Sequence, residues 1–327
     1  MGKEFNWIER YFRQPFSYQK NIPGILGIGD DAALIPASLK SDASHWAVST
    51  DTLNEGVHFT TDMPPDTVAY KALAVNISDM AAMGSDPQYF FLALSLPAQK
   101  EGEMEAWLAD FSGGLKQAAE QFQVVLMGGD TCRSVSGISV SITVMGKVAK
   151  DQALLRSGAQ VGDHVYVSGE LGWAALGLQV QQGQLKLPAP FQEQAIQALY
   201  APKPQVALGR ALLGIANSAI DISDGLMGDA LHIADASDVG IEIELDKLPL
   251  PSKDIGLSEQ ALLQLALCGG EDYQLCFTVA EKNLPQLKLI SEEHSLWCVG
   301  RCVEGSGVKW QEGRLENPKG LSSFQHF

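Results

Sequence analysis

The chain has 327 residues, of which 46% are hydrophobic, and a formal net charge of −16 at pH 7. This length and this apolar fraction suffice for one large or two ordinary domains with a full hydrophobic core. The excess of acidic residues argues against a nucleic-acid partner, since binding to a nucleic-acid backbone depends on clustered Lys and Arg.

Apolar stretches in the sequence are too short to cross a membrane. The longest, at residues 89–96 and 138–144, fall far below the ~20 residues that span a bilayer. Charged Glu4, Glu9 and Arg10 stand where a signal peptide would have its apolar region. We therefore expect a cytoplasmic protein with no membrane partner. The 5 cysteines contain no C-x-x-C pair, which predicts reduced thiols and neither a disulfide framework nor a zinc site.

The first half of the chain alternates short apolar runs with longer helical patterns, which predicts a mixed α/β domain. Asp66 is the expected N-cap of the first long helix, and Gly84 and Pro87 are expected to end it. In chain order we expect a strand at 46–49, a helix at 67–83, a strand at 89–96, a helix at 104–122, and strands at 124–126 and 138–148.

The segment at 150–163 is more polar and glycine-containing, and it is the expected domain boundary. The second half again has an α/β pattern. We expect a strand at 164–168, helices at 173–182, 192–200 and 205–216, and a strand, a helix and a strand between 219 and 245. The predicted fold class is thus α/β (α+β), with two mixed domains at residues 1–150 and 151–327.

Apolar runs repeatedly end in aspartate along the whole chain. These residues are Asp30, Asp31, Asp51, Asp79, Asp130, Asp221 and Asp224. Because an apolar segment carries its last residues to the edge of a core, unpaired carboxylates there are costly and need cations. Without Cys/His ligand spacing, hard oxygen ligands indicate Mg²⁺, which proteins usually share with substrate phosphates. The acidic charge therefore does not exclude phosphorylated small molecules.

Several of these motifs also have a purely structural interpretation. Residues 27–31, GIGDD, lack the third glycine of a dinucleotide fingerprint, and alone they are typical of a tight turn. Asn76 and Asp79 share one helical face, where a core hydrogen bond would also explain them. His58 has the spacing of an ordinary loop histidine, and Asp224 has that of a helix N-cap. The sequence has no G-x-x-x-x-G-K-[ST], so any ATP would be bound without a P-loop.

Other motifs place oxygen ligands or flexible backbone at the ends of strands. Ser49, Thr50 and Asp51 end one strand with three consecutive oxygen-bearing side chains. In residues 128–130, GGD, paired glycines would let the backbone approach a phosphate closely, although a simple turn is the alternative. Residues 269–273, GGEDY, again combine a glycine hinge with acidic side chains.

Together, these segments resemble the thiamine-monophosphate kinases. That family belongs to a superfamily with aminoimidazole ribonucleotide synthetase, selenophosphate synthetase and the hydrogenase-maturation dehydratase. The match spans almost the whole chain, and the second and last segments favour the kinases over their relatives. In family order, the matching segments are GIGDDAALI, STDTLNEGVHF, KALAVNISDMAAMG, GGDT, LLRSGA, DISDGL and CGGEDY.

The resemblance implies two α/β domains of the aminoimidazole ribonucleotide synthetase type. The N-terminal domain would bind ATP and metal and pair with its copy in a homodimer, through a barrel-like interface. The implied reaction transfers the γ-phosphoryl group of ATP to thiamine monophosphate, which gives thiamine diphosphate and ADP in the last step of thiamine diphosphate biosynthesis.

The resemblance also assigns roles to individual residues. Several Mg²⁺ ions would be held by Asp31, Ser49, Thr50, Asp51, Asp79, Asp130, Asp221 and Asp224, and the role of Asp30 beside them is left open. The residues implied to contact ATP are Gly129, Asp130, Arg156 and Ser223. Those implied to contact thiamine monophosphate are His58, Glu271 and Phe324. The implied catalytic residues are Asp51, Asp130 and Asp221.

Elementary chemistry agrees with such a reaction. A phosphate acceptor is largely anionic at neutral pH, because its second pKa is near ~6, so no general base is needed and we expect direct transfer without a phosphoenzyme. Another superfamily enzyme acting on a ribonucleotide is the first alternative. Selenide chemistry, which normally uses an N-terminal Cys or selenocysteine, is disfavoured because residues 1–47 contain no Cys. The hydrogenase-maturation dehydratase, which ends in a reactive Cys, is disfavoured because this sequence ends in Phe327. A non-catalytic nucleotide- or metal-binding module would bind ATP without turnover.

Overall fold

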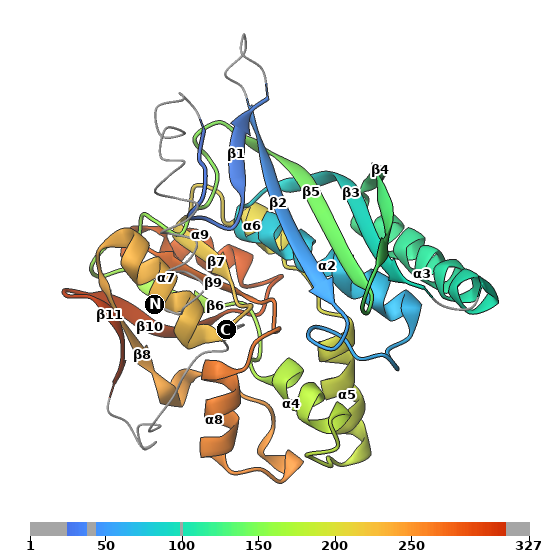
Figure 1. The fold of residues 1–327 in the computed structure, drawn as a ribbon. Helices are drawn as coiled ribbons and strands as arrows, with labels where there is room; N and C mark the ends of the chain where they lie inside the picture. The colour runs from blue at the N-terminus through green and yellow to red at the C-terminus, as the bar shows by residue number, and fades with distance from the viewer. Residues whose placement is uncertain (1–24, 38–43, 99–100, 312–327) are drawn as a thin grey trace.

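Figure 1 shows a computed structural model of the protein, which describes residues 25–37, 44–98 and 101–311. The chain forms two mixed α/β units, each built around one sheet. The first sheet has the strand order β1-β2-β5-β3-β4, and the second has the order β11-β8-β10-β6-β9-β7. The two-unit prediction is therefore confirmed, and neither sheet closes into a barrel within the described residues.

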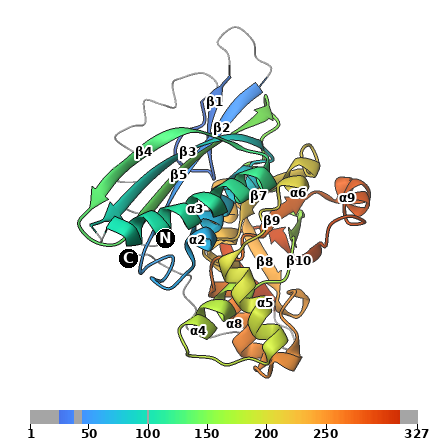
Figure 2. The same cartoon turned by 90° about the vertical axis from the view of Figure 1, so that its right-hand side faces the viewer.

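In the first unit, two helices cover one face of the sheet (Figure 2). Strand β5 shows why: Val140, Ile142 and Val144 are buried against the helices, while the residues between them are partly exposed on the other face. Its elements are β1 (Ala33–Pro36), β2 (Ser44–Asn54), α2 (Pro65–Ala82), β3 (Asp86–Pro97), α3 (Glu101–Phe122), β4 (Val125–Ser134) and β5 (Ser139–Ala149).

The second unit has helices on both faces of its sheet. Helices α7 and α8 pack on one face, whereas α6, α9 and the end of α2 pack on the other. A smaller cluster joins α4, α5 and α8. The elements are β6 (His164–Val167), α4 (Trp173–Gln181), α5 (Ala189–Tyr200), α6 (Val206–Ala211), β7 (Ala216–Asp221), α7 (Leu226–Ser237), β8 (Gly240–Glu244), α8 (Glu259–Cys268), β9 (Leu275–Val279), α9 (Leu284–Ile290), β10 (Trp297–Val303) and β11 (Gly307–Gln311).

Two local predictions are wrong. Asp66 is not the N-cap of α2, because Pro65 occupies the first turn and Pro64 is the cap residue, so Asp66 lies inside the first turn. The helix predicted at 205–216 ends at Ala211, since the chain must turn before β7 begins at Ala216. Gly84 does end α2 as predicted, with a positive φ of 62° that favours glycine.

Helix α2 connects the two units. It is buried nearly all round, because its N-terminal part packs under the first sheet and its last residues, Ala81 and Ala82, belong to the core of the second unit. A helix enclosed in this way has no solvent-facing stripe, so each polar side chain on it needs a partner. The polar residues of α2 therefore indicate where a site with polar partners lies beside the helix.

Candidate active site

A cavity of about 920 Å³ lies where the two units meet. The first unit contributes residues 28–31, 49 and 51–53, loop residues 56–60, and Val75 and Asp79 of α2. The second contributes Arg156, the start of α4, the loop after β7, and residues 268–271 and 273. This volume is in the range of cavities that hold cofactors and drug-sized ligands.

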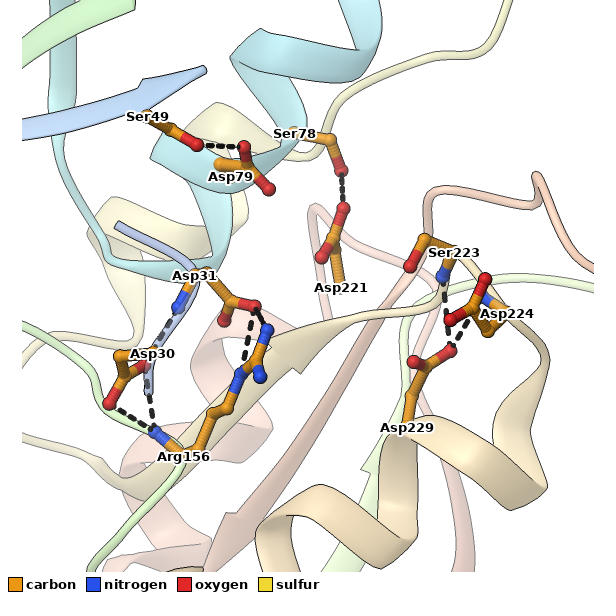
Figure 3. Close-up of polar contacts among 10 residues, drawn as sticks. All are labelled: Asp30, Asp31, Ser49, Ser78, Asp79, Arg156, Asp221, Ser223, Asp224 and Asp229. Carbon is orange, nitrogen blue, oxygen red and sulfur yellow. Dashed lines mark hydrogen bonds and ion pairs between the residues drawn. The ribbon is translucent and has the colours of Figure 1, made fainter. Parts of the chain in front are cut away.

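Three aspartates from distant parts of the sequence, two of them buried and Asp79 partly buried, meet in this cavity (Figure 3). Asp31 lies just before β1, Asp79 lies on α2, and Asp221 ends β7. One carboxylate oxygen from each lies within 4.8 Å of the others. Ser49 and Asp51 alternate with outward-facing residues of β2, so both face the same cavity. Of the aspartates predicted at the ends of apolar segments, Asp31, Asp79 and Asp221 therefore lie close together in the fold.

The protein supplies few cationic partners to these carboxylates. Ser49 Oγ donates a hydrogen bond to Asp79 Oδ2 at 2.5 Å, and Ser78 Oγ donates one to Asp221 Oδ2 at 2.6 Å. Arg156 donates from Nε and Nη2 to Oδ1 of Asp31, at 3.0 and 2.5 Å (Figure 3). The other oxygen of Asp31, Oδ2, is buried and has no hydrogen-bond partner.

Burial and mutual repulsion raise the pKa values of these carboxyl groups. Burial is the first cause at Asp31, Asp51, Asp79 and Asp221, and the pKa of Asp221 rises to about 7. At Asp79 the neighbouring Asp51 and Asp221 add to the increase. Burial acts to lower the pKa of the Arg156 guanidinium, but the charge and hydrogen bond of Asp31 together with the charges of Asp30 and Asp221 outweigh it, so this pKa rises. Arg156 is thus a permanent cation, and it cannot balance the whole cluster.

The donor set suits a hard divalent cation. All ligands on offer are oxygens, one carboxylate oxygen is buried without a partner, and the carboxyl groups repel one another. Mg²⁺ prefers such oxygen ligands, whereas zinc would favour Cys or His. These side chains therefore fit Mg²⁺.

The loop after β7 is held by a residue that the sequence analysis did not single out. Asp229, on the first turn of α7, accepts hydrogen bonds from the backbone N–H groups of Ser223 and Asp224, at 3.0 and 3.1 Å (Figure 3). Asp224 itself is not the N-cap of α7, because Gly225 takes that position. An acidic residue in a first helical turn was the sequence signal for Asp229.

Asp30 points to the second unit rather than to the carboxylate cluster. Both of its carboxylate oxygens accept a hydrogen bond from the backbone N–H of Arg156, at 3.2 Å. Burial, followed by the charge of Asp31, raises the pKa of Asp30 to about 7. Asp30 therefore helps to position Arg156.

At the other end of the cavity, the lining residue Glu271 forms an ion pair with the buried Lys71. Lys71 of α2 donates from Nζ to the backbone carbonyl of His58 at 3.1 Å and lies 2.9 Å from Oε1 of Glu271. His58 Nδ1 accepts a hydrogen bond from the backbone N–H of Asn54 at 3.0 Å. The structure thus brings His58 and Glu271 together, and it adds Lys71, which the sequence analysis missed. A lysine inside an otherwise apolar helix was the signal for it.

Thr50, Gly129 and Asp130 do not line the cavity. Thr50 lies on the opposite face of β2 from Ser49 and Asp51, and its hydroxyl pairs with Thr143 at 2.8 Å. The register of the first sheet places Asp130 opposite Ala93, then Ser141, then Thr52. Three strand spacings separate Asp130 from β2, about 14 Å. Phe324 lies outside the described residues.

Comparisons with known proteins show the family to which the chain belongs. The AIR synthase related protein family matches with its N-terminal domain at residues 29–148 and its C-terminal domain at residues 160–311. The thiamine-monophosphate kinase of Haemophilus influenzae is 37% identical over 99% of this chain and 98% of its own. That of Escherichia coli strain K12 is 44% identical over 86% of this chain and 83% of its own.

A solved structure extends this similarity to the fold. AaThiL complexed with AMPPCP and TMP superposes with a TM-score of 0.81 and 31% identity, covering 100% of this chain and 97% of that one. The sequence match and the structural match thus span both units. The chain belongs to the AIR synthase related family and, within it, to the thiamine-monophosphate kinases.

Proposed function

We propose that this protein transfers the γ-phosphoryl group of ATP to thiamine monophosphate and releases thiamine diphosphate and ADP. The observation that carries the proposal is the cluster of Asp31, Asp79 and Asp221 in a cavity between the two units. The related AaThiL is complexed with AMPPCP and TMP, which are an ATP analogue and the proposed acceptor. The reaction brings two anions together, so the site needs a cation that the chain does not itself provide.

Each end of the cavity has its own task in this reaction. Mg²⁺ ions would be held by Asp31, Ser49, Asp51, Asp79, Asp221 and Asp224, and they would neutralise the charge that develops on the transferred phosphoryl group. Arg156 and Ser223, which line the cavity from the second unit, would bind the phosphates of ATP. His58 and Glu271, which also line the cavity, would bind the acceptor.

The chain's own residues act by binding and orientation. The acceptor phosphate is already an anionic nucleophile at neutral pH, because its pKa is near ~6, so no side chain has to remove a proton. Asp51 and Asp221 would act through metal ions rather than as nucleophiles. Direct in-line transfer therefore needs no phosphoenzyme.

A homodimer would explain the residues that lie away from the cavity. Strand β4 is an edge strand, and Val125, Leu126 and Met127 on it are 54%, 48% and 54% exposed. Exposed apolar edges of this kind are typical of interfaces. We infer that the open face of the first sheet packs against a second copy in a barrel-like interface. The second copy would then supply its Gly129 and Asp130 to the cavity.

The dimer proposal also assigns tasks to the two predicted domains. Residues 1–150 would bind ATP and metal and form the interface, and residues 151–327 would complete the cavity. A cytoplasmic location stays a prediction. None of the helices among the described residues has the length and apolar character needed to cross a membrane.

The test incubates purified protein with ATP, Mg²⁺ and thiamine monophosphate, and in parallel with unphosphorylated thiamine. Chromatography follows thiamine diphosphate and ADP. We expect equal amounts of both products with the monophosphate and no turnover with thiamine. ATP binding without product would overturn the proposal. It would favour a ribonucleotide-processing enzyme or a non-catalytic nucleotide-binding module.

A further inference from the structure

Lys71 is a buried cation at the end of the cavity remote from the aspartate cluster. Its side chain is 1% exposed, and its Nζ contacts the His58 carbonyl and both carboxylate oxygens of Glu271, at 2.9 and 3.0 Å. These partners are 13 and 200 residues away in the sequence. A buried ammonium group is unfavourable unless it is paired and hydrogen-bonded, so these contacts explain why it is tolerated there.

Both partners belong to loops that line the cavity. The loop with His58 is closed by a hydrogen bond from the backbone N–H of Gly56 to the carbonyl of Phe59, at 2.7 Å. Glu271 has a positive φ of 69°, an unfavourable conformation for a residue with a side chain. Its backbone N–H is held by the carbonyl of Ser223 at 2.8 Å, and its carboxylate is held by Lys71. Lys71 therefore fixes the direction of the Glu271 side chain.

Helix α2 connects this end of the cavity to the aspartate cluster. Lys71, Val75 and Asp79 follow one another at intervals of four residues and lie on one stripe of the helix. Because the helix rises 1.5 Å per residue, Lys71 and Asp79 are about 12 Å apart along its axis. A rigid, buried helix thus sets the spacing between the metal-binding end and the end with His58 and Glu271.

We propose that Lys71 is a positioning residue for the phosphoryl acceptor, which acts by holding the His58 loop and the Glu271 carboxylate together as one recognition surface. The inference rests on the proposed function and assigns the acceptor end of the same cavity. Thiamine carries a positively charged ring, which a carboxylate attracts. Lys71 fixes the direction of the Glu271 carboxylate and neutralises part of its charge. The carboxylate therefore accepts hydrogen bonds from the substrate in one fixed direction.

The test measures KM for thiamine monophosphate and for ATP in Lys71→Met, which keeps the length of the side chain and removes its charge. We expect KM for thiamine monophosphate to rise about tenfold or more, as for the loss of a charge-assisted hydrogen bond, and KM for ATP to stay within about twofold. Lys71→Arg keeps the charge but changes the geometry, so its rise in KM should be smaller, about threefold, and still confined to thiamine monophosphate. Lys116→Met, on the exposed face of α3, is the matched control and should change neither constant.

The outcomes separate this inference from the proposed function. Wild-type protein without turnover of thiamine monophosphate contradicts the proposed function and removes the inference with it. Normal wild-type turnover, together with equal effects of Lys71→Met on both KM values, shows a merely structural role and overturns the inference alone. If Lys71→Met does not fold, Lys71→Arg decides: a selective rise in KM for thiamine monophosphate supports the inference, and parallel or absent changes refute it.

Discussion

The two ends of the cavity handle buried charge in opposite ways. At one end, Lys71 and Glu271 form a pair whose charges balance within the chain. At the other, Asp31, Asp79 and Asp221 lie close together, and Arg156 bonds only one of them. A balanced pair holds loops in place without any ligand, whereas an unbalanced cluster stays under repulsion until a cation arrives. The surplus negative charge therefore marks the place where an external cation would stabilise the protein.

The largest expected effect is on turnover. Replacing Asp221 by Asn should lower kcat about a thousandfold or more, since it removes a metal ligand on which the charge of the transferred group depends. The fold should persist, because the change removes like charge from the cluster. Steady-state kinetics and a thermal melt measure the two effects.

Asp238→Asn is the control for that substitution. Asp238 is exposed at the end of α7 with a φ of 55°, a conformation that Asn tolerates well. We expect its kcat to equal that of the wild type. Near-normal turnover in Asp221→Asn would contradict a metal-binding role for the cluster.

At the end with Lys71 and Glu271, removing one charge should lower the stability of the fold, whereas Asp221→Asn lowers turnover and leaves the fold intact. Lys71→Met leaves the Glu271 carboxylate without its cation and should lower the free energy of unfolding by about 2 kcal/mol. This is less than the ~3–5 kcal/mol for fully buried pairs, because the side chain of Glu271 is 27% exposed. Urea unfolding checks the value.

A double variant sharpens the contrast between the two ends. Lys71→Met with Glu271→Gln removes both charges and should recover most of the lost stability. Stability that falls equally in the single and double variants would show that packing of the lysine stem, rather than charge balance, matters at this end.

The dependence of stability on pH distinguishes the ends further. Burial, and then the charge of Asp31, raises the pKa of Asp221 from 3.8 to about 7, so the folded protein binds more protons than the unfolded chain in this interval. Without Mg²⁺, the free energy of unfolding should therefore fall as the pH rises from about 4 to 7. Thermal melts at pH 5 and pH 8, with and without Mg²⁺ at matched ionic strength, test this. Mg²⁺ should raise the melting temperature more at pH 8, and an equal increase at both would argue against the cluster as its site.

The smallest effect concerns the loop beside the cluster. Asp229→Asn keeps one acceptor oxygen but removes the charge that receives the N–H groups of Ser223 and Asp224. We expect KM for ATP to rise about fivefold, equivalent to roughly 1 kcal/mol, with little change for thiamine monophosphate. Unchanged kinetics would show that this loop is held well enough by its other backbone contacts.

Much of this arrangement could be predicted from the sequence. The strands expected at 46–49, 89–96 and 138–148 are present, because alternating apolar residues on a half-buried sheet leave a local pattern. The meeting of Asp31, Asp79 and Asp221 followed from the positions of these residues at the ends of apolar segments. Such features depend on a few neighbouring residues, which a single sequence displays.

The missed features depend on tertiary structure. The contact between Lys71 and Glu271 joins residues 200 positions apart, so no local pattern contains it. The distance of Asp130 from the cavity follows from the register of four strands, which the sequence alone does not fix. Asp66 is not the N-cap of α2 because Pro65, whose backbone is already set for a helix, occupies the first helical position. The cap position therefore falls on Pro64.

The central claim is that the unbalanced cluster holds a divalent cation. Titration of Mn²⁺, a paramagnetic substitute for Mg²⁺, into the wild type and into Asp79→Asn, followed by electron paramagnetic resonance, tests it most directly. Asp79 is the member of the cluster that α2 carries, and its pKa is raised well above its usual range by burial and by Asp51. We predict saturable Mn²⁺ binding to the wild type, displaced by Mg²⁺ and weakened at least about tenfold in Asp79→Asn. Equal binding to both proteins would contradict the account.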